Sequence, residues 1–489
     1  MIETRPLINA EEWNGKLFSG GWREGAGGTA DVVDKSAGTV LGRIGVASKS
    51  DVADACRRAY DAAPAWGAMP AQERAAIMSR AADRLEAARE EIVPWIVRET
   101  GGILAKGAFE VDVSVAEFRE AARLTAHETR HVIESSEQME SVAIRVPLGV
   151  VGIITPWNVP LVLAMRSVAP ALALGNTVVL KPDIQTAVVG GFLIAAVLQA
   201  AGLPENVFHV VPGDAEPGQA LTVDPHVAMI SFTGSTAVGR LVGEAAGRNL
   251  KRVALELGGN SPFIVLDDAD IELATSAGAF GSFFHQGQVC MASSRHLVHE
   301  KIADAYIARL VERTNALAVG DPMQGEVALG PLINDQQLAR VVGIVDRTVE
   351  AGGTLATGGT HDGRFYRPTV LTGVTPEMPA FQDEIFGPVA PVTTFKDDDE
   401  AVELANRTEY GLAAGIISAD IERASRMAAR LRTGLAHIND QTVNDDPRVP
   451  FGGFGASGNG GRFGSVNNVE EFTTWRWITT RKKPHPYPF

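Results

Sequence analysis

The chain has 489 residues, of which 45% are apolar and 21% are charged, and its formal net charge is −15 at pH 7. This length exceeds what one hydrophobic core supports, so it predicts two or three domains. The negative charge disfavours nucleic acid and anionic membranes as partners, because both bind basic surfaces.

The N-terminus, the cysteines and the histidines narrow the class of protein further. Residues 1–13 lack the apolar run of a signal peptide, and no stretch of about twenty apolar residues predicts a membrane span. Two cysteines are too few for a disulfide framework, and the ten histidines show no metal-ligand spacing such as HExxH. We therefore expect a cytoplasmic protein without a metal site.

The first part of the chain, residues 50–123, is predicted to be helical. It is rich in alanine and in Glu/Arg pairs, as in the segment RAADRLEAAREEIVPWIVRETGG with its two closing glycines. Cys56 recurs with Val52, Ala59 and Ala63 at helical spacing. This spacing predicts that Cys56 is a small core residue.

From residue 149 onwards the pattern alternates between strands and helices. In chain order we expect a strand at 149–158, a helix at 160–175 kinked at Pro170, a strand at 176–182, a helix at 186–204, a strand at 207–213, a strand, turn and helix at 227–247, and a strand at 252–259. This alternation is typical of a βαβαβ unit with a parallel sheet.

The same alternation returns after Gly259 and predicts a second α/β domain over about residues 260–460. Two segments fit neither domain. Residues 128–147 have the pattern of an extended hairpin, and residues 470–489 form a tail that contains Trp and Arg. Such extensions commonly pair with the sheet of a neighbouring subunit, so we expect an oligomer.

Cys290 has neighbours that a structural cysteine rarely has. It lies in FFHQGQVCMASSR (residues 283–295), among aromatic, polar and glycine residues rather than aliphatic ones. At an ordinary pKa only about 3% of the thiol is ionised at pH 7, so a nucleophile here requires local activation. The pattern indicates a reactive cysteine.

Two polar residues stand near the ends of predicted buried strands. In VALELGG, alternation places Glu256 on the face opposite Leu255 and Leu257. Glu256 is either half of a buried ion pair or a carboxylate with a raised pKa that acts as a general base. Asn158 lies at the carboxyl edge of the sheet, where it could stabilise an oxyanion or serve only as a turn residue or helix cap.

Three weaker signals suit a cofactor. The turn FTGSTAVG (232–239) opens a helix whose N–H groups could hold a phosphate, although it lacks the GxGxxG spacing. Lys181 ends a strand where dinucleotide-binding folds read the ribose. A lysine at a strand end is otherwise unremarkable, and Glu384 in DEIFGP is by itself as consistent with an acidic loop.

Taken together and in order, these segments resemble the aldehyde dehydrogenase superfamily over essentially the whole chain. The motifs are TPWN, NTVVLKP, FTGST, LELGGNSP, GQVC, DEIFGPV (383–389) and PFGGFGASGNG (450–460). The resemblance implies an α/β fold with two Rossmann-like parallel-sheet domains and a small β oligomerisation extension. The expected boundaries are 1–127 with 148–257 for the dinucleotide-binding domain, 258–469 for the catalytic domain, and 128–147 with 470–489 for the extension.

The resemblance also implies a mechanism. Cys290 would attack the aldehyde carbon to give a thiohemiacetal, while Asn158 and the backbone N–H of Cys290 would form the oxyanion hole. Hydride would pass to the nicotinamide of NAD or NADP and leave a thioester. Glu256 would then activate water to release the carboxylic acid.

The cofactor residues implied by the resemblance come from both domains. Lys181 would bind the adenine ribose, Ser235 the diphosphate and Glu384 the nicotinamide ribose. The other residues expected at the cofactor are Thr155, Pro156, Trp157, Ile184, Gly234, Leu257 and Phe386. NAD-preferring relatives commonly carry an acidic residue at the position of Ile184. Without that carboxylate a 2′-phosphate is not repelled there, which makes NADP use plausible, whereas the neighbouring Asp183 favours NAD.

Two further departures and one run of sequence bear on the substrate. His285 stands where asparagine is usual and is expected to be structural, and Val289 replaces a cysteine or threonine of many relatives. The run PLVLAMRSVAPALALGNTVVLKPD looks like the benzaldehyde and vanillin dehydrogenase branch, which oxidises aromatic aldehydes. Candidates to line a flat apolar pocket are then Trp157, Met165, Val289 and the 440–451 loop. Aliphatic aldehydes and semialdehydes are the alternative.

Three alternative functions would use some of the same residues and motifs. A cysteine hydrolase without redox chemistry would not need the cofactor motifs, and an inactive relative would not need Cys290, Glu256 and Asn158. A CoA-acylating enzyme would not need Glu256 to activate water. We therefore expect a non-acylating, NAD(P)-dependent aldehyde dehydrogenase that forms a homodimer or homotetramer.

Overall fold

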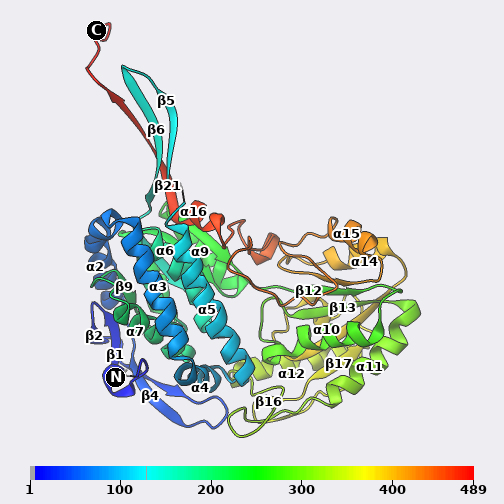
Figure 1. Ribbon diagram of the computed structural model, residues 1–489. Helices are drawn as coiled ribbons and strands as arrows, with labels where there is room; N and C mark the ends of the chain where they lie inside the picture. Colours follow the sequence, from blue (N-terminus) through cyan, green and yellow to red (C-terminus); the bar gives the residue numbers. More distant parts are fainter. Residues whose placement is uncertain (1–5, 128) are drawn as a thin grey trace.

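The computed structural model describes residues 6–127 and 129–489. Over these residues the chain forms two lobes, each built on a mostly parallel seven-stranded sheet, and an arm that projects from the first lobe (Figure 1). This architecture confirms the predicted α/β fold with two parallel sheets. Residues 1–5 of the predicted first domain and Glu128 of the predicted hairpin lie outside the described residues.

The first sheet has the strand order β11-β10-β7-β8-β9-β1-β2, in which β11 to β9 are parallel and β1 and β2 are antiparallel edge strands. Alternate residues of β7 enter different cores, with Val150 and Ile154 on one face and Val151 and Ile153 on the other. Both faces are buried, which is why these strands are almost wholly apolar. The strands are β1 (Lys16–Ser19), β2 (Trp22–Glu24), β7 (Val150–Ile154), β8 (Thr177–Lys181), β9 (Phe208–Val210), β10 (Val227–Thr233) and β11 (Arg252–Glu256).

Helices cover both faces of this sheet (Figure 1). On one face α2 and α8 contact β7, while α6 and α7 lie on the other face and pack against α3. The predicted helical region is confirmed, and Cys56 on α2 is buried among Val52, Ala55 and Ala59. The helices are α1 (Ala10–Trp13), α2 (Lys49–Ala68), α3 (Ala71–Ala87), α4 (Arg89–Thr100), α5 (Leu104–Leu124), α6 (Pro160–Ala173), α7 (Leu193–Ala200), α8 (Ala215–Val223) and α9 (Thr236–Arg248).

The second sheet has the strand order β14-β17-β18-β13-β12-β19-β20, and only β14 is antiparallel to its neighbour in this sheet. Helices α10 and α11 contact one face of it and α14 and α15 the other. The strands are β12 (Ser261–Val265), β13 (Ser293–His299), β14 (Thr354–Thr357), β17 (Thr369–Thr372), β18 (Val389–Phe395), β19 (Gly415–Ile417) and β20 (His437–Ile438). The helices of this lobe are α10 (Ile271–Phe283), α11 (Ala303–Asn315), α12 (Asp335–Glu350), α13 (Pro379–Gln382), α14 (Asp398–Asn406) and α15 (Ile421–Ala428).

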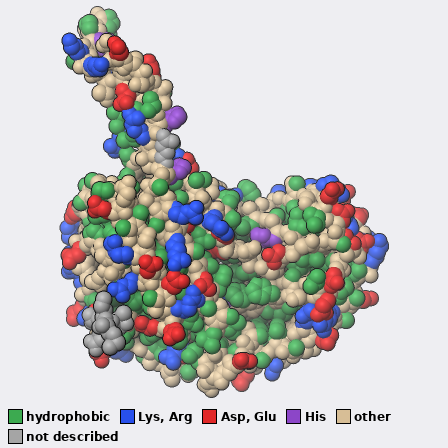
Figure 2. All heavy atoms as spheres, viewed as in Figure 1, with side chains coloured by type: hydrophobic (Ala, Val, Ile, Leu, Met, Phe, Trp, Pro, Cys, Tyr) green, Lys and Arg blue, Asp and Glu red, His purple; other side chains and the backbone are tan. Residues whose placement is uncertain are grey.

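The arm is a three-stranded antiparallel sheet of β5 (Arg130–Ser135), β6 (Met139–Pro147) and β21 (Thr473–Arg481). It stands clear of the body of the molecule (Figures 1 and 2). The predicted hairpin is therefore present over its described residues. The C-terminal tail, which follows α16 (Val466–Phe472), pairs with β6 of its own chain.

Some elements escaped the sequence analysis. The short hairpin β3 (Thr29–Val33) and β4 (Val40–Gly45) and the small hairpin β15 (His361–Asp362) and β16 (Phe365–Tyr366) are partly exposed and carry no clear apolar alternation. The predicted helix at 186–204 begins as a 3₁₀ turn and one π-helical turn before α7. Within the described part of the chain, no helix combines the length and apolar character needed to span a membrane.

Candidate active site

The predicted site residues of the first lobe all stand at one edge of its sheet. This is the carboxyl edge of the neighbouring parallel strands β8, β7, β10 and β11. The chain order reverses between β7 and β10, which is the switch point where open α/β sheets bind ligands. The residues are Lys181 at the end of β8, Thr155, Pro156, Trp157 and Asn158 after β7, Gly234 and Ser235 after β10, and Glu256 at the end of β11.

Residues of the second lobe reach this edge from the opposite direction. Cys290 comes just before β13 and Glu384 shortly before β18, so both stand at the amino ends of parallel strands. The side chain of Asn158 links the two lobes, because its Nδ2 donates a hydrogen bond of 2.9 Å to the Gln288 carbonyl. The site therefore forms where the carboxyl edge of one sheet meets the amino edge of the other.

Glycines permit this close approach. A Cβ atom on Gly259 would overlap the carbonyl oxygen of Cys290, and one on Gly258 would overlap the carboxylate of Glu384. Gly287 has a φ of +66° and lies directly against the backbone of the loop that follows Glu384. Gly258 and Gly259 are thus required because any side chain at these positions would overlap a neighbouring group. This is the physical reason for the two glycines of the LELGG motif.

The backbone before Cys290 adopts an uncommon conformation. In the turn η3 (Phe284–Gly287), His285 has φ 49° and Gln286 has φ 56°, both in the left-handed region. An L-residue adopts this region at a cost of roughly 1–2 kcal/mol. Such residues persist only where the surrounding structure imposes them, and they cluster at functional sites.

Glu256 is an isolated carboxylate inside the site. It is 3% exposed, and neither of its oxygens has a hydrogen-bond partner among the described residues. Burial raises its pKa to about 8, an effect that the positive charges of Arg166 and Arg462 partly oppose. Of the two interpretations that the sequence left open, the geometry favours a carboxylate with a raised pKa over an ion pair.

The Cys290 thiol is surrounded by buried groups, although the residue as a whole keeps partial exposure. Burial raises its pKa to about 12, Arg166 opposes this rise, and the carboxylates of Glu384 and Glu256 reinforce it. The thiol is therefore protonated at neutral pH. A nearby base is required to take its proton, and Glu256 is an unpaired carboxylate in this site.

Arg166 is a site residue that the sequence analysis missed. It lies on α6, where its guanidinium forms a buried ion pair with Asp445 and sits 3.8 Å from the centroid of the Phe451 ring. Its charge lowers the pKa of both Glu256 and Cys290. The available signal was a single arginine in an otherwise apolar helix, LVLAMRSVA.

The prediction that Met165 lines the pocket is wrong. Met165 is 0% exposed and packs in the core of the first lobe with Leu161 and Val168. Successive residues of an α-helix point about 100° apart, so Met165 faces the core while Arg166 faces the 440–451 loop. The sequence run indicated the right helix but the wrong side chain.

An apolar wall lies beside Cys290. Val289, Met291 and Phe451 form one buried cluster, against which Cys290 and Phe284 pack. Val289 and the end of the 440–451 loop therefore lie beside Cys290, and their role in a substrate pocket stays a prediction. Phe284 in turn stacks on Phe280, with ring centroids 5.0 Å apart, and meets Phe109 edge to face at 6.2 Å.

The carboxyl edge of the first sheet has groups that suit a dinucleotide. Lys181 is 8% exposed, and its ammonium makes no hydrogen bond or ion pair with the residues that the structure describes. A buried ammonium of this kind fits ribose hydroxyls, which would satisfy its unused donors. Ser235 caps α9 by accepting from the Val238 N–H at 3.4 Å, and the adjacent free N–H groups of the helix suit a diphosphate.

Glu384, Phe386 and Trp157 meet at the other end of this edge. The Glu384 carboxylate accepts a hydrogen bond of 2.9 Å from the Gly259 N–H, and burial raises its pKa to about 7. Glu384 is therefore packed into the site rather than free in an acidic loop. The rings of Trp157 and Phe386 meet edge to face with centroids 5.4 Å apart.

Ile184, Asp183 and Leu257 occupy the remaining predicted positions. Ile184 is half-buried in the turn after Lys181, while the Asp183 carboxylate accepts from the Gln185 N–H at 2.9 Å. Asp183 is thus engaged in its own turn. Leu257 packs in the core that α9 covers.

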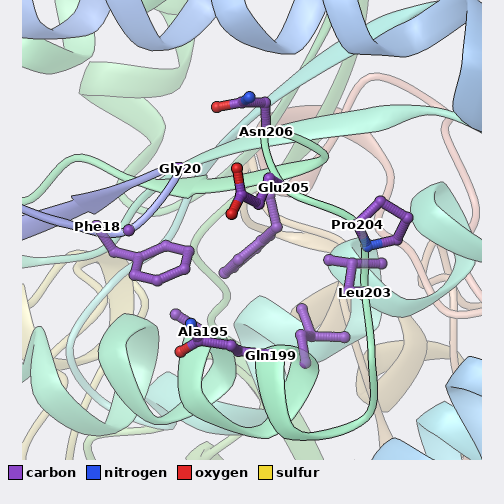
Figure 3. Close-up of a pocket in the computed structure, with 11 residues that line it drawn as sticks. Phe18, Gly20, Ala195, Gln199, Leu203, Pro204, Glu205 and Asn206 are labelled. Atoms are coloured by element: carbon purple, nitrogen blue, oxygen red, sulfur yellow. The ribbon is translucent and has the colours of Figure 1, made fainter.

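One cavity in the first lobe lies away from this chemistry. The one drawn in Figure 3, of about 90 Å³, lies before β9, at the amino edge of the first sheet. Its lining includes Phe18, Leu203 and Asn206 and none of the predicted site residues. No group of three or more His, Cys, Asp or Glu side chains in the described residues could hold a metal ion.

Comparison with known protein families decides the family of this chain. The sequence profile of the aldehyde dehydrogenase family matches residues 22–478. The chain belongs to this family. It is 52% identical over 484 residues to a vanillin dehydrogenase from an Amycolatopsis species, covering 99% of this chain and 100% of that protein. It is also 52% identical over 478 residues to a benzaldehyde dehydrogenase (NAD+) from Pseudomonas putida, covering 98% of each. A solved structure of a salicylaldehyde dehydrogenase from Pseudomonas putida G7, complexed with salicylaldehyde, has a TM-score of 0.93 at 35% identity over 97% of this chain and 99% of that one.

Family membership confirms the predicted class, so the protein is an aldehyde dehydrogenase. Cys290, Glu256 and Asn158 come from three separated segments, and the fold brings them to the meeting edges of the two sheets. The roles of these individual residues, and of the cofactor residues, stay predictions.

We expect the raised pKa of Glu256 to govern the pH dependence of turnover. A general base is active when deprotonated, so the hydrolytic rate of the dehydrogenase should rise with pH, with a midpoint near 8. Glu256→Gln should abolish this rise and slow steady-state turnover by about 100-fold or more. The burst of reduced cofactor should still appear, but it should form more slowly, because the thiol then loses its proton without the carboxylate. Stopped-flow and steady-state absorbance at 340 nm measure both phases. An unchanged steady-state rate would remove Glu256 from the hydrolytic step.

Proposed function

We propose that this dehydrogenase oxidises aromatic aldehydes to carboxylic acids through a thioester on Cys290, with NAD or NADP as the hydride acceptor. The observation that carries the proposal is the convergence of Cys290, the unpaired Glu256 carboxylate and the Asn158 amide at one edge, beside an aromatic and apolar wall. The names of the two 52% identical relatives support the same substrate class.

Each residue has a distinct task in this reaction. Glu256 takes the proton of the Cys290 thiol, and the sulfur adds to the aldehyde carbon. The developing oxyanion accepts hydrogen bonds from the free N–H of the Asn158 amide and from the Cys290 backbone. A bound nicotinamide supplies the hydride acceptor. After hydride transfer Glu256 releases to solvent the proton that it took from the thiol. The carboxylate can then act as a base a second time and activate the water that cleaves the thioester.

The wall around Cys290 favours a flat ring over a flexible chain. Phe284, Phe280 and Phe109 form a continuous aromatic path, and Phe284 also packs against the cluster of Val289, Met291 and Phe451. Aromatic rings gain from edge and stacked contacts beyond the area that they bury. A semialdehyde carries a carboxylate, which an unpaired buried cation would bind. Arg166 does not offer such a site, because it is already paired with Asp445.

The cofactor contacts support a redox enzyme over a simple cysteine hydrolase. Lys181, the start of α9 after Ser235, and Glu384 would hold the adenine ribose, the diphosphate and the nicotinamide ribose. A hydrolase has no use for a buried, unpaired lysine at this edge. Because Glu256 is free to serve water, hydrolysis is favoured over transfer to CoA.

The test is an assay of purified enzyme at 340 nm with benzaldehyde, vanillin and hexanal, each with NAD and with NADP. We expect kcat/KM for the two aromatic aldehydes to exceed that for hexanal by about tenfold or more. Hexanal cannot make the stacked contacts of an aromatic ring, and losing about 1.4 kcal/mol of contact energy corresponds to a tenfold effect. Cys290→Ala should abolish oxidation, with Cys56→Ala as a matched control that keeps it. A preference for hexanal would reject the aromatic substrate, and oxidation by Cys290→Ala would reject the nucleophile.

The residue at position 184 should set the choice between NAD and NADP. Ile184→Glu places a carboxylate next to the adenine ribose, where it can bond the 2′-hydroxyl and repel a 2′-phosphate. We expect the ratio of kcat/KM for NAD to that for NADP to rise by about tenfold or more, which corresponds to about 1.4 kcal/mol. Ile184→Gln, of similar size but uncharged, is the matched control. If neither variant changes the ratio, another residue reads the 2′ position.

We further propose that the enzyme is a cytoplasmic homodimer or homotetramer held by the arm. Both edge strands of the arm, β5 and β21, have unpaired backbone groups and exposed apolar side chains, among them Ile133 (59% exposed) and Trp477 (71%). Exposed apolar edges of this kind are suited to pairing with another chain. The two free cysteines agree with a reducing compartment.

Charge on the arm should dissociate the oligomer. Introducing Ile133→Asp and Trp477→Asp together should shift the association midpoint by about tenfold or more in protein concentration, because burying an unpaired carboxylate is costly. Light scattering coupled to size exclusion across a dilution series measures the mass. Val40→Asp, an equally exposed apolar position outside the arm (58%), is the control. An arm variant with the wild-type mass at every dilution would place the interface elsewhere.

A further inference from the structure

A buried ion pair lies next to the apolar wall beside Cys290. It joins Arg166 of α6 to Asp445 of the 440–451 loop, and the two side chains are 5% and 7% exposed. The Arg166 guanidinium lies over the Phe451 ring, 3.8 Å from its centroid. Phe451 belongs to the cluster against which Cys290 packs. A single ring therefore connects the ion pair to the surroundings of the nucleophile.

An open groove lies on the other side of Asp445. It has a volume of about 460 Å³, and it is lined by α5 residues such as Val113 and Ala116 and by residues 445–448 of the loop. Asp445 thus belongs both to the groove and to the ion pair. A substrate that occupies the space between this groove and Cys290 would lie against the pair.

The pair has hydrogen-bonding capacity that the protein leaves unused. An arginine carries five N–H donors. Within the described part of the chain only Nη2 of Arg166 has an acceptor, which is Oδ2 of Asp445, so Nε and Nη1 have none. Oδ1 of Asp445 likewise receives no hydrogen bond from a described residue. Unpaired polar groups at a buried position are costly, so a ligand that offers both a donor and an acceptor would be favoured here.

Packing alone does not account for the pair. Arg166 is the only charged residue of α6, whose other side chains are mostly apolar and all buried. An ion pair in such surroundings is often no more stabilising than apolar side chains of similar volume, because both charges lose their hydration. Contact with a polar ligand explains the pair better than core stability does.

The charges at this place favour a neutral ligand group over an anion. Arg166 and Asp445 carry opposite charges, so the pair offers no net positive charge. Glu117 of α5 is a further buried acid here, because burial and the charge of Asp445 raise its pKa to about 8, and Arg166 opposes the rise. A carboxylate on the substrate would meet these acidic groups. A hydroxyl can accept from the guanidinium and donate to the carboxylate at the same time.

We propose that Arg166 and Asp445 determine specificity by binding a neutral hydroxyl group on the aromatic ring of the substrate. The unused N–H groups of Arg166 donate to the hydroxyl oxygen, and the hydroxyl donates to Oδ1 of Asp445. The Phe451 ring supports the guanidinium from one face. The inference rests on the proposed oxidation of aromatic aldehydes and narrows it to rings with a hydroxyl substituent.

Matched pairs of substrates test the proposal. The aldehydes are 3-hydroxybenzaldehyde and 4-hydroxybenzaldehyde, each compared with its methoxy counterpart, which has a similar electronic effect on the ring but cannot donate a hydrogen bond. The readout is the ratio of kcat/KM for the hydroxy aldehyde to that for the methoxy aldehyde, measured at about pH 6, where a phenolic hydroxyl is protonated. The ratio cancels any change that a variant makes to the chemistry common to both substrates.

Two variants remove the recognition in different ways. Arg166→Met combined with Asp445→Leu removes both polar groups and leaves no buried charge without its partner. We expect a wild-type ratio of about ten for at least one ring position and a ratio of about one in the double variant, because hydrogen bonds to charged groups are lost. Asp445→Asn has nearly the same shape and serves if the double variant folds poorly. Its amide oxygen is taken by Arg166 and its amide N–H groups offer the hydroxyl no acceptor, so the ratio should fall by about threefold or more.

An ion pair on the same groove is the matched control. Arg119 and Glu86 line the groove and form an exposed ion pair. Arg119→Met combined with Glu86→Leu should leave the ratio within about twofold of the wild type, because an exposed pair contributes little. A control that lowers the ratio as much as the Arg166 and Asp445 variants do would assign the effect to the charge of the groove and overturn the proposal.

The remaining outcomes separate this inference from the proposed function. If the wild-type ratio is near one at both ring positions, or if the variants keep the wild-type ratio, hydroxyl recognition by the pair is overturned and the oxidation of aromatic aldehydes stands. If the wild-type enzyme prefers hexanal to benzaldehyde, the proposed substrate class fails, and the inference about Arg166 and Asp445 fails with it.

Discussion

The site depends on contact between backbones where the chain passes from the first sheet to the second. Gly258 and Gly259 follow the strand that ends in Glu256, and each leaves room that a side chain would fill, for the Glu384 carboxylate and for the Cys290 carbonyl. Gly287 does the same for the loop after Glu384. Because none of these contacts tolerates a Cβ, the two lobes can bring Glu256, Cys290 and Glu384 within one small volume. Bulky residues at these positions would separate the lobes and the chemistry with them.

The contact between the lobes also buries the acidic groups of the site, and burial sets their protonation states. Removal from water raises the pKa of Glu256 to about 8, that of Glu384 to about 7 and that of Cys290 to about 12. Three acidic groups close together repel one another when they are ionised, even in water. Their removal from water strengthens this repulsion. The positive charge of Arg166, which Asp445 and Phe451 hold in place, opposes the rise in the pKa of Glu256 and of Cys290. The balance leaves the resting thiol protonated and gives Glu256 a pKa in the range that suits a general base at physiological pH.

The left-handed turn before Cys290 connects this electrostatic arrangement to geometry. Its conformation is unfavourable for His285 and Gln286, and hydrogen bonds to two other segments, at Gly101 and at Pro331 and Ile333, maintain it. The turn presents the Gln288 carbonyl to the Asn158 amide, two residues before Cys290, so it links the positions of Cys290 and Asn158. Stored strain of this kind is common where a few atoms must be held in place during a reaction.

The amino-acid sequence by itself determined the βαβ alternation, the helical region, the buried Cys56 and the residues at strand ends, because hydrophobic periodicity and turn residues are local properties. It also indicated Cys290, Glu256 and Asn158 through motifs that agree in order along the whole chain. It did not determine that Met165 faces the core and Arg166 the site, since a nearly continuous apolar helix gives no sign of which face meets which neighbour. The pairing of β21 with β6, the orphaned ring of His285 and the pKa values of the site were decided only by the tertiary structure. These features depend on which distant segments come together, and on how much water they exclude, which no local pattern records.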